Sequence, residues 1–233
     1  MQTKYNLINK ILAFFTLFIS FGVYYDTMAP TVSFWDTGEF IATSHILGVP
    51  HPPGSPLFLL VGKFFSLIPI SSDIAYRVNI FSPIISALTI SLLFLICNHF
   101  IDRVEPKDSN KFFKMWSSLT ASLTFAFTHS HWFNAVETEV YAFSGFMTAL
   151  VIYLIMRWSE KMHNSDHVIY LIFISYIIGL ATGLHLLNLL TIPFIGLIIY
   201  FSIGKISTKN LILTITLSLI SFFVIQSFIF QGL

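Results

Sequence analysis

The chain of 233 residues is 55% hydrophobic and only 10% charged, with a formal net charge of +1 and a mean hydropathy of +0.80. Soluble domains carry about 25% charged residues, so this composition excludes a soluble globular protein and indicates an integral membrane protein. The balanced charge offers no basic patch for nucleic acid, and the single cysteine, Cys97, excludes an intrachain disulfide and a cysteine-based metal site.

Seven apolar stretches are long enough for membrane helices, which need about 20 mostly apolar residues. The first is followed by GVYYDTMAP (22–30), which has no small-residue cleavage site, so we expect an uncleaved anchor and not a signal peptide. A further run, 56–70, has only 15 residues, contains Lys63 and is bounded by prolines, which favours an interfacial or re-entrant helix. The predicted spans are roughly 7–25, 79–101, 115–130, 137–157, 168–184, 186–203 and 210–230.

The distribution of basic residues tests whether the 56–70 run crosses the membrane, because short cytoplasmic loops are rich in Lys and Arg. If the run crosses, the loop 102–114 and its four basic residues are exported. If it does not cross, ten of the twelve basic residues share the cytoplasmic side with the N-terminus, and only Lys63 and Arg77 lie outside. The ten are Lys4, Lys10, Arg103, Lys107, Lys111, Lys114, Arg157, Lys161, Lys205 and Lys209.

We therefore predict an all-α integral membrane module of about seven transmembrane helices, with a cytoplasmic N-terminus and a long first external loop over 26–78. No soluble domain is visible, and the chain stops just after its last apolar run. We expect residues 1–233 to form a single module that is the N-terminal part of a longer protein.

In this topology most of the acidic and histidine side chains that border the spans lie on the external side. Polar groups beside the hydrocarbon are costly and tend to be functional. The residues gathered there are Asp36, Glu39, His45, His51, Arg77, His129, His131, Glu137, Glu139 and His185.

The stretch FWDTGEFIATSHILGVPHPPGSP (34–56) carries the densest group of these residues. A helix over 35–48 places Asp36 and Glu39 on one face. We expect Pro52 and Pro53 to end this helix and to hold His51 on a stiff, extended turn. Asp36 alone fits a helix N-cap equally well, but Asp36 together with Glu39 and His51 favours a functional site.

The link between the third and fourth spans offers a second candidate site. Glu137 and Tyr141 share a helical face, so Glu139 meets the same ligand as Glu137 only if this segment is extended, where the two could hold a divalent cation. The alternative is solvated acids at a helix start. His129 and His131 are weak metal candidates, since interfacial hydrogen bonding explains them as well.

His185 begins a span beside Asn188, where a role in the site and a role in helix packing are equally supported.

No firm metal site follows from the sequence; Glu137 and Glu139 are the weak candidates for a divalent cation. The sequence contains no H-E-x-x-H, G-x-S-x-G or Walker motif. No charged residue lies in the middle of a span, which argues against a transporter or pump.

Residues 34–65 resemble the opening motif of a family of bacterial and eukaryotic polytopic membrane proteins, formerly catalogued as a domain of unknown function, whose eukaryotic member is a protein O-mannosyltransferase. The family pattern is Asp-Ser/Thr-Gly-Glu, a short helix, and His-Pro-Pro-Gly-x-Pro-Leu. Here these are Asp36–Glu39 and His51–Leu57, and WFNAVETEVYAF (132–143) resembles a second signature. The resemblance covers most of the chain and groups it with the GT-C superfamily of glycosyltransferases.

The resemblance implies seven spans and a first external loop with juxtamembrane helices and an acidic catalytic residue. It implies an inverting glycosyltransferase at the extracytoplasmic face, the periplasmic side of a bacterial inner membrane. The donor would be a sugar on a polyprenyl phosphate, with mannose as the candidate, and the acceptor a Ser or Thr hydroxyl of an exported protein. A lipid or a glycan is the alternative acceptor. Whether the reaction requires a divalent cation is left open by the resemblance.

For this reaction Asp36 is the candidate base, and Glu39 either supports the acceptor or tunes the pKa of Asp36. His51 and Arg77 are candidates for the departing phosphate. The remaining substrate-binding candidates are His131, Glu137, Tyr141 and His185. Two other functions remain: a transporter or flippase of a lipid-linked solute, in which the acids face a pathway open to both sides, and a scaffold subunit, for which the acids are dispensable.

Overall fold

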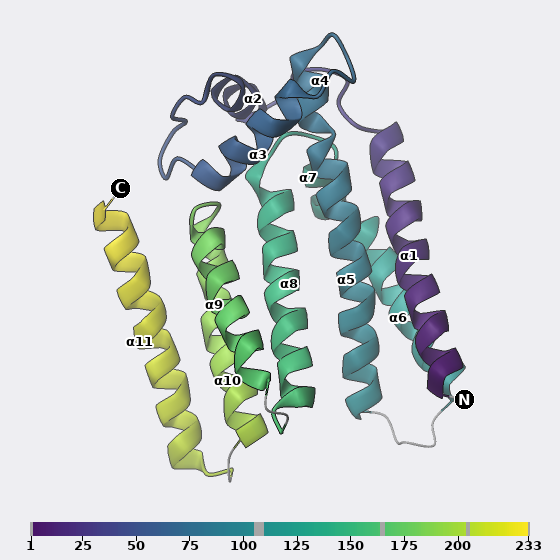
Figure 1. Cartoon of the computed structure of the whole chain (residues 1–233), viewed down its shortest axis with the longest axis vertical. Coiled ribbons are helices and arrows are strands. Elements are labelled where there is room, and N and C mark those ends of the chain that lie inside the picture. Colours follow the sequence, from purple (N-terminus) through teal and green to yellow (C-terminus); the bar gives the residue numbers. More distant parts are fainter. Residues whose placement is uncertain (1, 105–109, 164–165, 204–205, 233) are drawn as a thin grey trace.

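The computed structural model of the chain describes residues 2–104, 110–163, 166–203 and 206–232. The expected cytoplasmic residues Lys107 and Lys205 lie outside these ranges. Within them the secondary structure is entirely helical. Long helices run side by side as a bundle, and short helices cover one end of it, opposite the end where the chain begins (Figure 1).

Seven of the helices that the structure describes form the bundle, one for each predicted span. Among the described residues, five segments are long and apolar enough to cross a membrane: 6–26, 74–104, 140–161, 186–203 and 208–228. The all-α membrane fold is thereby confirmed. The bundle helices are α1 (Gln2–Asp26), α5 (Phe81–Val104), α6 (Lys111–Ala126), α8 (Val140–Lys161), α9 (His167–Thr182), α10 (Thr191–Ile203, preceded by the 3-10 helix η1, Leu186–Leu190) and α11 (Thr208–Gly232).

Helices α6 and α9 are shorter than a typical span, whereas α10 together with η1 reaches 18 residues. Helices α6 and α9 have 16 residues each, which corresponds to about 24 Å of helix against a hydrocarbon core of about 30 Å. Helix α6 begins earlier than expected because the side chain of Asn110 accepts a hydrogen bond from the Phe112 N–H and caps the helix there.

The short helices at one end are α2 (Thr37–Ile46), α3 (Pro56–Leu67) and α4 (Ile74–Asn79); with their connecting segments they are called the cap below. Helix α7 (His129–Ala135) links α6 to α8 at the same end of the bundle. Helix α3 has 12 residues and lies across the end of the bundle (Figure 1). At about 18 Å it is too short to span the hydrocarbon, as predicted for the 56–70 run.

The end of α2 differs from the prediction. The helix stops at Ile46 because Leu47 adopts a left-handed conformation (φ 54°). The N–H groups of Leu47 and Gly48 then bond to the carbonyls of Ser44 and Thr43, which closes the last turn. The expectation that Pro52 and Pro53 end this helix is therefore wrong: they lie beyond this turn, and the 52–53 peptide bond is cis.

The cap is fixed to the bundle by packing. Four phenylalanine rings form a continuous chain of edge-on contacts from α2 to α8, with centroid separations of 5.3, 6.2 and 5.1 Å. Such ring pairs each add about 0.5–1.5 kcal/mol beyond their buried area. The rings belong to Phe40, Phe58, Phe81 and Phe143.

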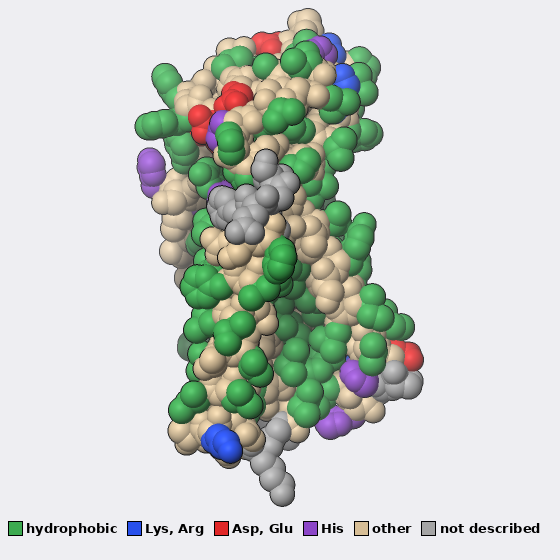
Figure 2. Space-filling model, turned by 90° about the vertical axis from the view of Figure 1, so that its left-hand side faces the viewer, with side chains coloured by type: hydrophobic (Ala, Val, Ile, Leu, Met, Phe, Trp, Pro, Cys, Tyr) green, Lys and Arg blue, Asp and Glu red, His purple; other side chains and the backbone are tan. Residues whose placement is uncertain are grey.

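Hydrogen bonds attach the long first loop to the α7–α8 link and to the segment that follows α9. On one side, the Ala29 N–H donates to the Val136 carbonyl (2.8 Å), and the buried Asn79 amide donates to the carbonyls of Ala29 (2.8 Å) and Thr31 (2.9 Å). On the other side, the Ser55 hydroxyl donates to the Leu184 carbonyl at 3.0 Å. Hydrophobic side chains cover much of the visible face of the bundle, and acidic and histidine side chains lie near the cap and at the opposite end (Figure 2).

Candidate active site

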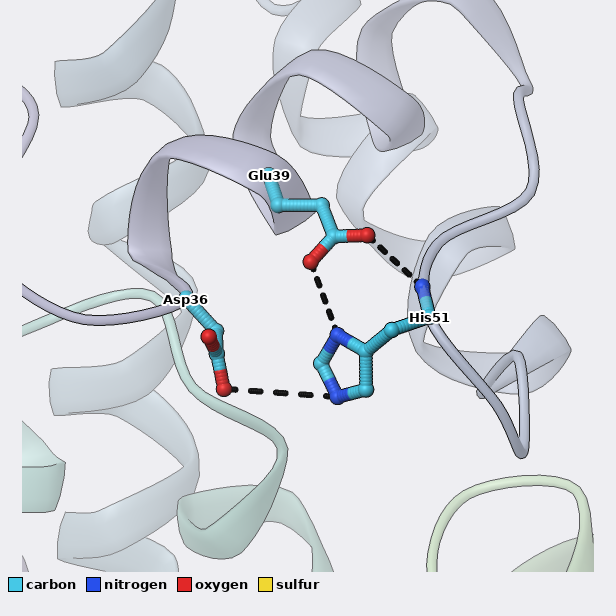
Figure 3. A group of neighbouring side chains, drawn as sticks. All are labelled: Asp36, Glu39 and His51. Atoms are coloured by element: carbon cyan, nitrogen blue, oxygen red, sulfur yellow. Dashed lines mark hydrogen bonds and ion pairs between the residues drawn. The ribbon is translucent and has the colours of Figure 1, made fainter.

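Three side chains meet on the surface of the cap. Asp36 and Glu39 come from the start of α2, and His51 comes from the loop that follows it (Figure 3). The carboxylate of Glu39 accepts two hydrogen bonds from His51, one from the backbone N–H (2.6 Å) and one from Nδ1 (2.7 Å). The other ring nitrogen, Nε2, lies 4.0 Å from Oδ2 of Asp36. These residues are called the trio below, and the sequence pattern had placed them together.

Asp36 occupies the N-cap position of α2, but its side chain makes no capping hydrogen bond. The carboxylate is instead turned toward His51, and 58% of the side chain is exposed. The capping alternative for Asp36 is therefore not supported by the geometry. The preceding residue, Trp35, has φ 58°, a left-handed conformation that is uncommon for a bulky residue and is found at functional sites.

The trio favours one protonation pattern. Hydrogen bonds from the His51 ring and backbone lower the pKa of Glu39. The same side-chain bond to Glu39 raises the pKa of His51, and the negative charges of Glu39, Asp36 and Glu139 raise it further. Each partner stabilises the charged form of the other, so the pair favours a carboxylate at Glu39 and an imidazolium at His51.

Two buried glutamates join the trio from the link between α7 and α8. This link is not helical at Glu137 and Glu139, and Glu139 is fully extended (φ −139°, ψ 148°). Glu137 is 2% exposed and accepts a hydrogen bond from the Ser33 hydroxyl at 2.7 Å, while its Oε1 has no hydrogen-bond partner. The link is thus not helical at either glutamate, as a shared ligand for the two would require.

The pKa values of both glutamates are raised. Burial raises the pKa of Glu137. Burial also raises the pKa of Glu139 to about 7, helped by the negative charges of Asp36 and Glu137. Because Glu139 interacts electrostatically with Asp36 and His51, these five residues form one acidic region, called the acid site below.

An apolar cavity of about 830 Å³ lies beside the His51 loop. Pro50 and Pro52, the neighbours of His51, form part of its wall. His185, between α9 and η1, also lines the cavity. Its ring packs against that of Tyr141, with centroids 5.3 Å apart. The lining residues are Gly48, Val49, Pro50, Pro52, Pro53, Gly54, Pro56, Leu59, His185, Leu186, Leu187, Leu190, Phe222 and Gln226.

Two predicted substrate-binding residues contact other groups. Arg77 on α4 donates from Nε to the Ser71 carbonyl (2.6 Å) and from Nη1 to the Ser66 carbonyl (3.2 Å), so it holds the α3–α4 connection. His131 on α7 packs against the rings of Tyr24 and Phe125, and burial lowers its pKa to about 4. Neither forms a hydrogen bond or ion pair with the trio.

Ser33 and Asn79 also contribute to the acid site, and neither was predicted from the sequence. Ser33 anchors Glu137, and Asn79 joins the first loop to the α7–α8 link by accepting a hydrogen bond from the Thr138 hydroxyl. Nothing in the sequence marks either residue, because each contact joins segments more than 50 positions apart.

The bundle and the cap define a polytopic membrane protein with a candidate catalytic site at one end. A sequence model of the family described as the protein O-mannosyl-transferase TMEM260 N-terminal domain matches residues 36–209. The chain therefore belongs to this family, and the predicted resemblance is confirmed.

Two curated relatives carry similar names. A Dictyostelium discoideum protein named protein O-mannosyl-transferase tmem260 is 28% identical over 200 residues, which cover 80% of this chain and 23% of the relative. A Mus musculus protein named protein O-mannosyl-transferase TMEM260 is 32% identical over 126 residues, 54% of this chain and 16% of the relative. The chain thus spans less than a quarter of either relative. No solved structure matches it.

Proposed function

We propose that the chain is the membrane module of an inverting GT-C glycosyltransferase that moves a sugar from a polyprenyl-phosphate donor to a hydroxyl acceptor. The observation that carries the proposal is the position of the trio, exposed on the cap and directly beside a large apolar cavity. A lipid-linked sugar needs both environments at once, apolar for the carrier and polar for the sugar and phosphate. The names of the relatives favour mannose as the sugar and a protein Ser or Thr as the acceptor.

In this reaction the acceptor oxygen bonds to the anomeric carbon while the bond from that carbon to the phosphate oxygen breaks. The acceptor proton passes to Asp36, and the polyprenyl phosphate leaves with the bonding electrons. The anomeric configuration inverts because a single displacement occurs. Asp36 is suited to the base role since its carboxylate is exposed and makes no helix-capping bond.

The geometry refines the role of Glu39. Both of its oxygens are engaged by His51, so we assign Glu39 to positioning His51 and not to holding the acceptor. An imidazolium at His51 would face the departing phosphate and stabilise its charge. Arg77, the other phosphate candidate, is bonded to backbone carbonyls of its own connection, which leaves His51 as the better-placed cation.

The cavity is the proposed site of the first part of the lipid carrier. Its wall is made mostly of prolines, leucines and Phe222, with His185 at its polar edge. Tyr141, packed on His185, and Glu137, beside Glu139, are proposed to face the sugar. His131 has no proposed contact with substrate, because it is packed between aromatic rings.

The proposed orientation places the cap outside the cytoplasm, on the periplasmic side of a bacterial inner membrane, and the N-terminus inside. The basic residues support it: of the described ones, Lys63 and Arg77 belong to the cap, whereas Arg103, Arg157 and Lys161 lie at the ends of bundle helices far from it. A flippase requires a pathway open to both sides, and the cavity borders the cap end alone, which favours the transferase.

The test is Asp36→Asn in membranes supplied with radiolabelled polyprenyl-phosphate mannose. We expect transfer to protein to fall at least about 100-fold, since a general base contributes about 10²–10⁴. Folding is unaffected because the side chain is exposed and caps nothing. Asp26→Asn is the matched control, an exposed aspartate at the end of α1 near the cap. Full activity in Asp36→Asn would remove the proposed base.

A further inference from the structure

The space between His51 and Asp36 has a width that a metal ion fits. Nε2 and Oδ2 are 4.0 Å apart, which is too long for a hydrogen bond. Two ligands of one octahedral ion, each about 2.1 Å from it, lie about 3.0 Å apart when adjacent and about 4.2 Å apart when opposite. The separation lies inside this range, so one ion can contact both atoms with little movement of either side chain.

The His51 ring is also oriented as a metal ligand. Its Nδ1 faces Glu39 at 2.7 Å (Figure 3). With Nδ1–H donating to that carboxylate, a cation that displaces the proton of Nε2 binds the lone pair left on this atom, which faces Asp36. A carboxylate that orients a histidine while the other ring nitrogen binds a metal is a recurring arrangement in metal sites. Glu39 supplies this support and fixes the His51 backbone as well.

The acid site contains more negative charge than its surroundings neutralise. Four carboxyl groups share this region with one histidine: Asp36 and Glu39 face His51, and Glu139 interacts electrostatically with Asp36, Glu137 and His51. Glu137 is 2% exposed, and its Oε1 is buried without a hydrogen-bond partner. A buried carboxyl oxygen without a partner is costly unless the group is protonated, paired or bound to a metal.

The cap's basic side chains do not neutralise these acids. The Lys63 ammonium donates to the His45 carbonyl, and Arg77 donates to the carbonyls of Ser66 and Ser71. In the part of the chain that the structure describes, no lysine or arginine forms an ion pair with the four carboxylates. A divalent cation would provide the missing positive charge.

We propose that His51 Nε2 and one carboxylate oxygen of Asp36 bind a single divalent cation of the Mn²⁺ or Mg²⁺ class, with Glu39 as the positioning residue. Carboxylate and water ligands suit these ions, and the exposed face of the trio leaves room for water. The role of the ion rests on the proposed function: the ion would take the place of the Nε2 proton of the His51 imidazolium and would stabilise the charge of the departing phosphate in its stead. The second oxygen of Asp36 stays free for the acceptor proton.

Direct metal binding tests the site without an activity assay. The purified protein, stripped with EDTA, is titrated with MnCl₂, and free Mn²⁺ is followed by its electron paramagnetic resonance signal. We expect one tight Mn²⁺ per chain, at least about 10-fold weaker binding in both His51→Gln and Asp36→Asn, and unchanged binding in His129→Gln, which alters an exposed histidine near the same end of the bundle. Wild-type binding in His51→Gln would overturn the proposal.

A second measurement does not depend on any variant folding correctly. Mn²⁺ bound to an imidazole shows hyperfine coupling to ¹⁴N, so the wild-type complex should show this coupling. Its absence would overturn the site. The two proposals fail separately: bound Mn²⁺ with ¹⁴N coupling but no sugar transfer removes the proposed function and keeps the site, whereas transfer that persists undiminished in EDTA removes the role of the ion and keeps the transferase.

Discussion

The ionisation of Glu139 should make the stability of this protein depend on pH. Glu139 is 5% exposed, and its pKa is raised from 4.5 to about 7, first by burial and then by the charges of Asp36 and Glu137. The folded protein therefore holds the Glu139 proton more tightly than the unfolded chain does. Its stabilising effect is complete below pH 4.5 and is lost as the pH rises through about 7.

The size of the effect follows from the two pKa values. A tenfold change in a protonation equilibrium corresponds to about 1.4 kcal/mol, so the rise from 4.5 to about 7 corresponds to about 3 kcal/mol. The ionised side chain should destabilise the fold by that amount above neutral pH. For a domain of this size, this free energy corresponds to a shift in melting temperature of roughly 6–12 °C.

Thermal unfolding in detergent with EDTA, at pH values from 5 to 8.5, measures this dependence in wild type and Glu139→Gln. We expect the melting temperature of the wild type to fall across this range and that of Glu139→Gln to fall much less, because glutamine cannot ionise. The two curves should meet near pH 5, where Glu139 is protonated. Parallel curves would show that Glu139 is not held in a desolvating, negatively charged environment. They would refute the inference that Glu139 lies close to Asp36 and Glu137 in the acid site.

Two further predictions concern the cap. Glu39→Gln should lower the pKa of His51, because it removes the acceptor charge that raises this pKa; an NMR titration of the imidazole checks this, and an unchanged pKa would contradict the hydrogen bond. Gly62→Ala should destabilise the protein by about 1–3 kcal/mol, since a new Cβ would overlap Ser44 Oγ. Gly145→Ala, whose Cβ would have no atom within 4 Å, should leave the melting temperature unchanged or raise it, and equal effects of both alanines would be evidence against close packing of α2 on α3.

Much of the architecture could be predicted from the sequence because lipid imposes a simple rule. Each apolar run of sufficient length becomes a helix, and all seven predicted spans correspond to bundle helices. The trio could be predicted for a related reason: Asp36 and Glu39 are one helical turn apart, and the chain returns to them within 12 residues at His51. Local spacing determines local contacts.

The remaining features depend on contacts between distant segments. The sequence gives no signal for the left-handed Leu47 that ends α2, since glycine or asparagine usually occupies such positions. Arg77 is a phosphate candidate because of its charge, and nothing in the sequence indicates its hydrogen bonds to the carbonyls of Ser66 and Ser71. The anchoring of Glu137 by Ser33 joins residues 104 positions apart, and only the packed fold brings them together.

The two attachments of the first loop have a mechanical consequence. Ser33, just before Asp36, is fastened to Glu137 in the α7–α8 link, whereas Ser55, just after His51, is fastened to Leu184 at the end of α9. Asp36 and His51 are thus attached to different parts of the bundle. The Glu39–His51 hydrogen bonds connect the two attached segments. A small displacement of α9 relative to α8 would therefore widen or narrow the gap between the Asp36 carboxylate and the His51 ring.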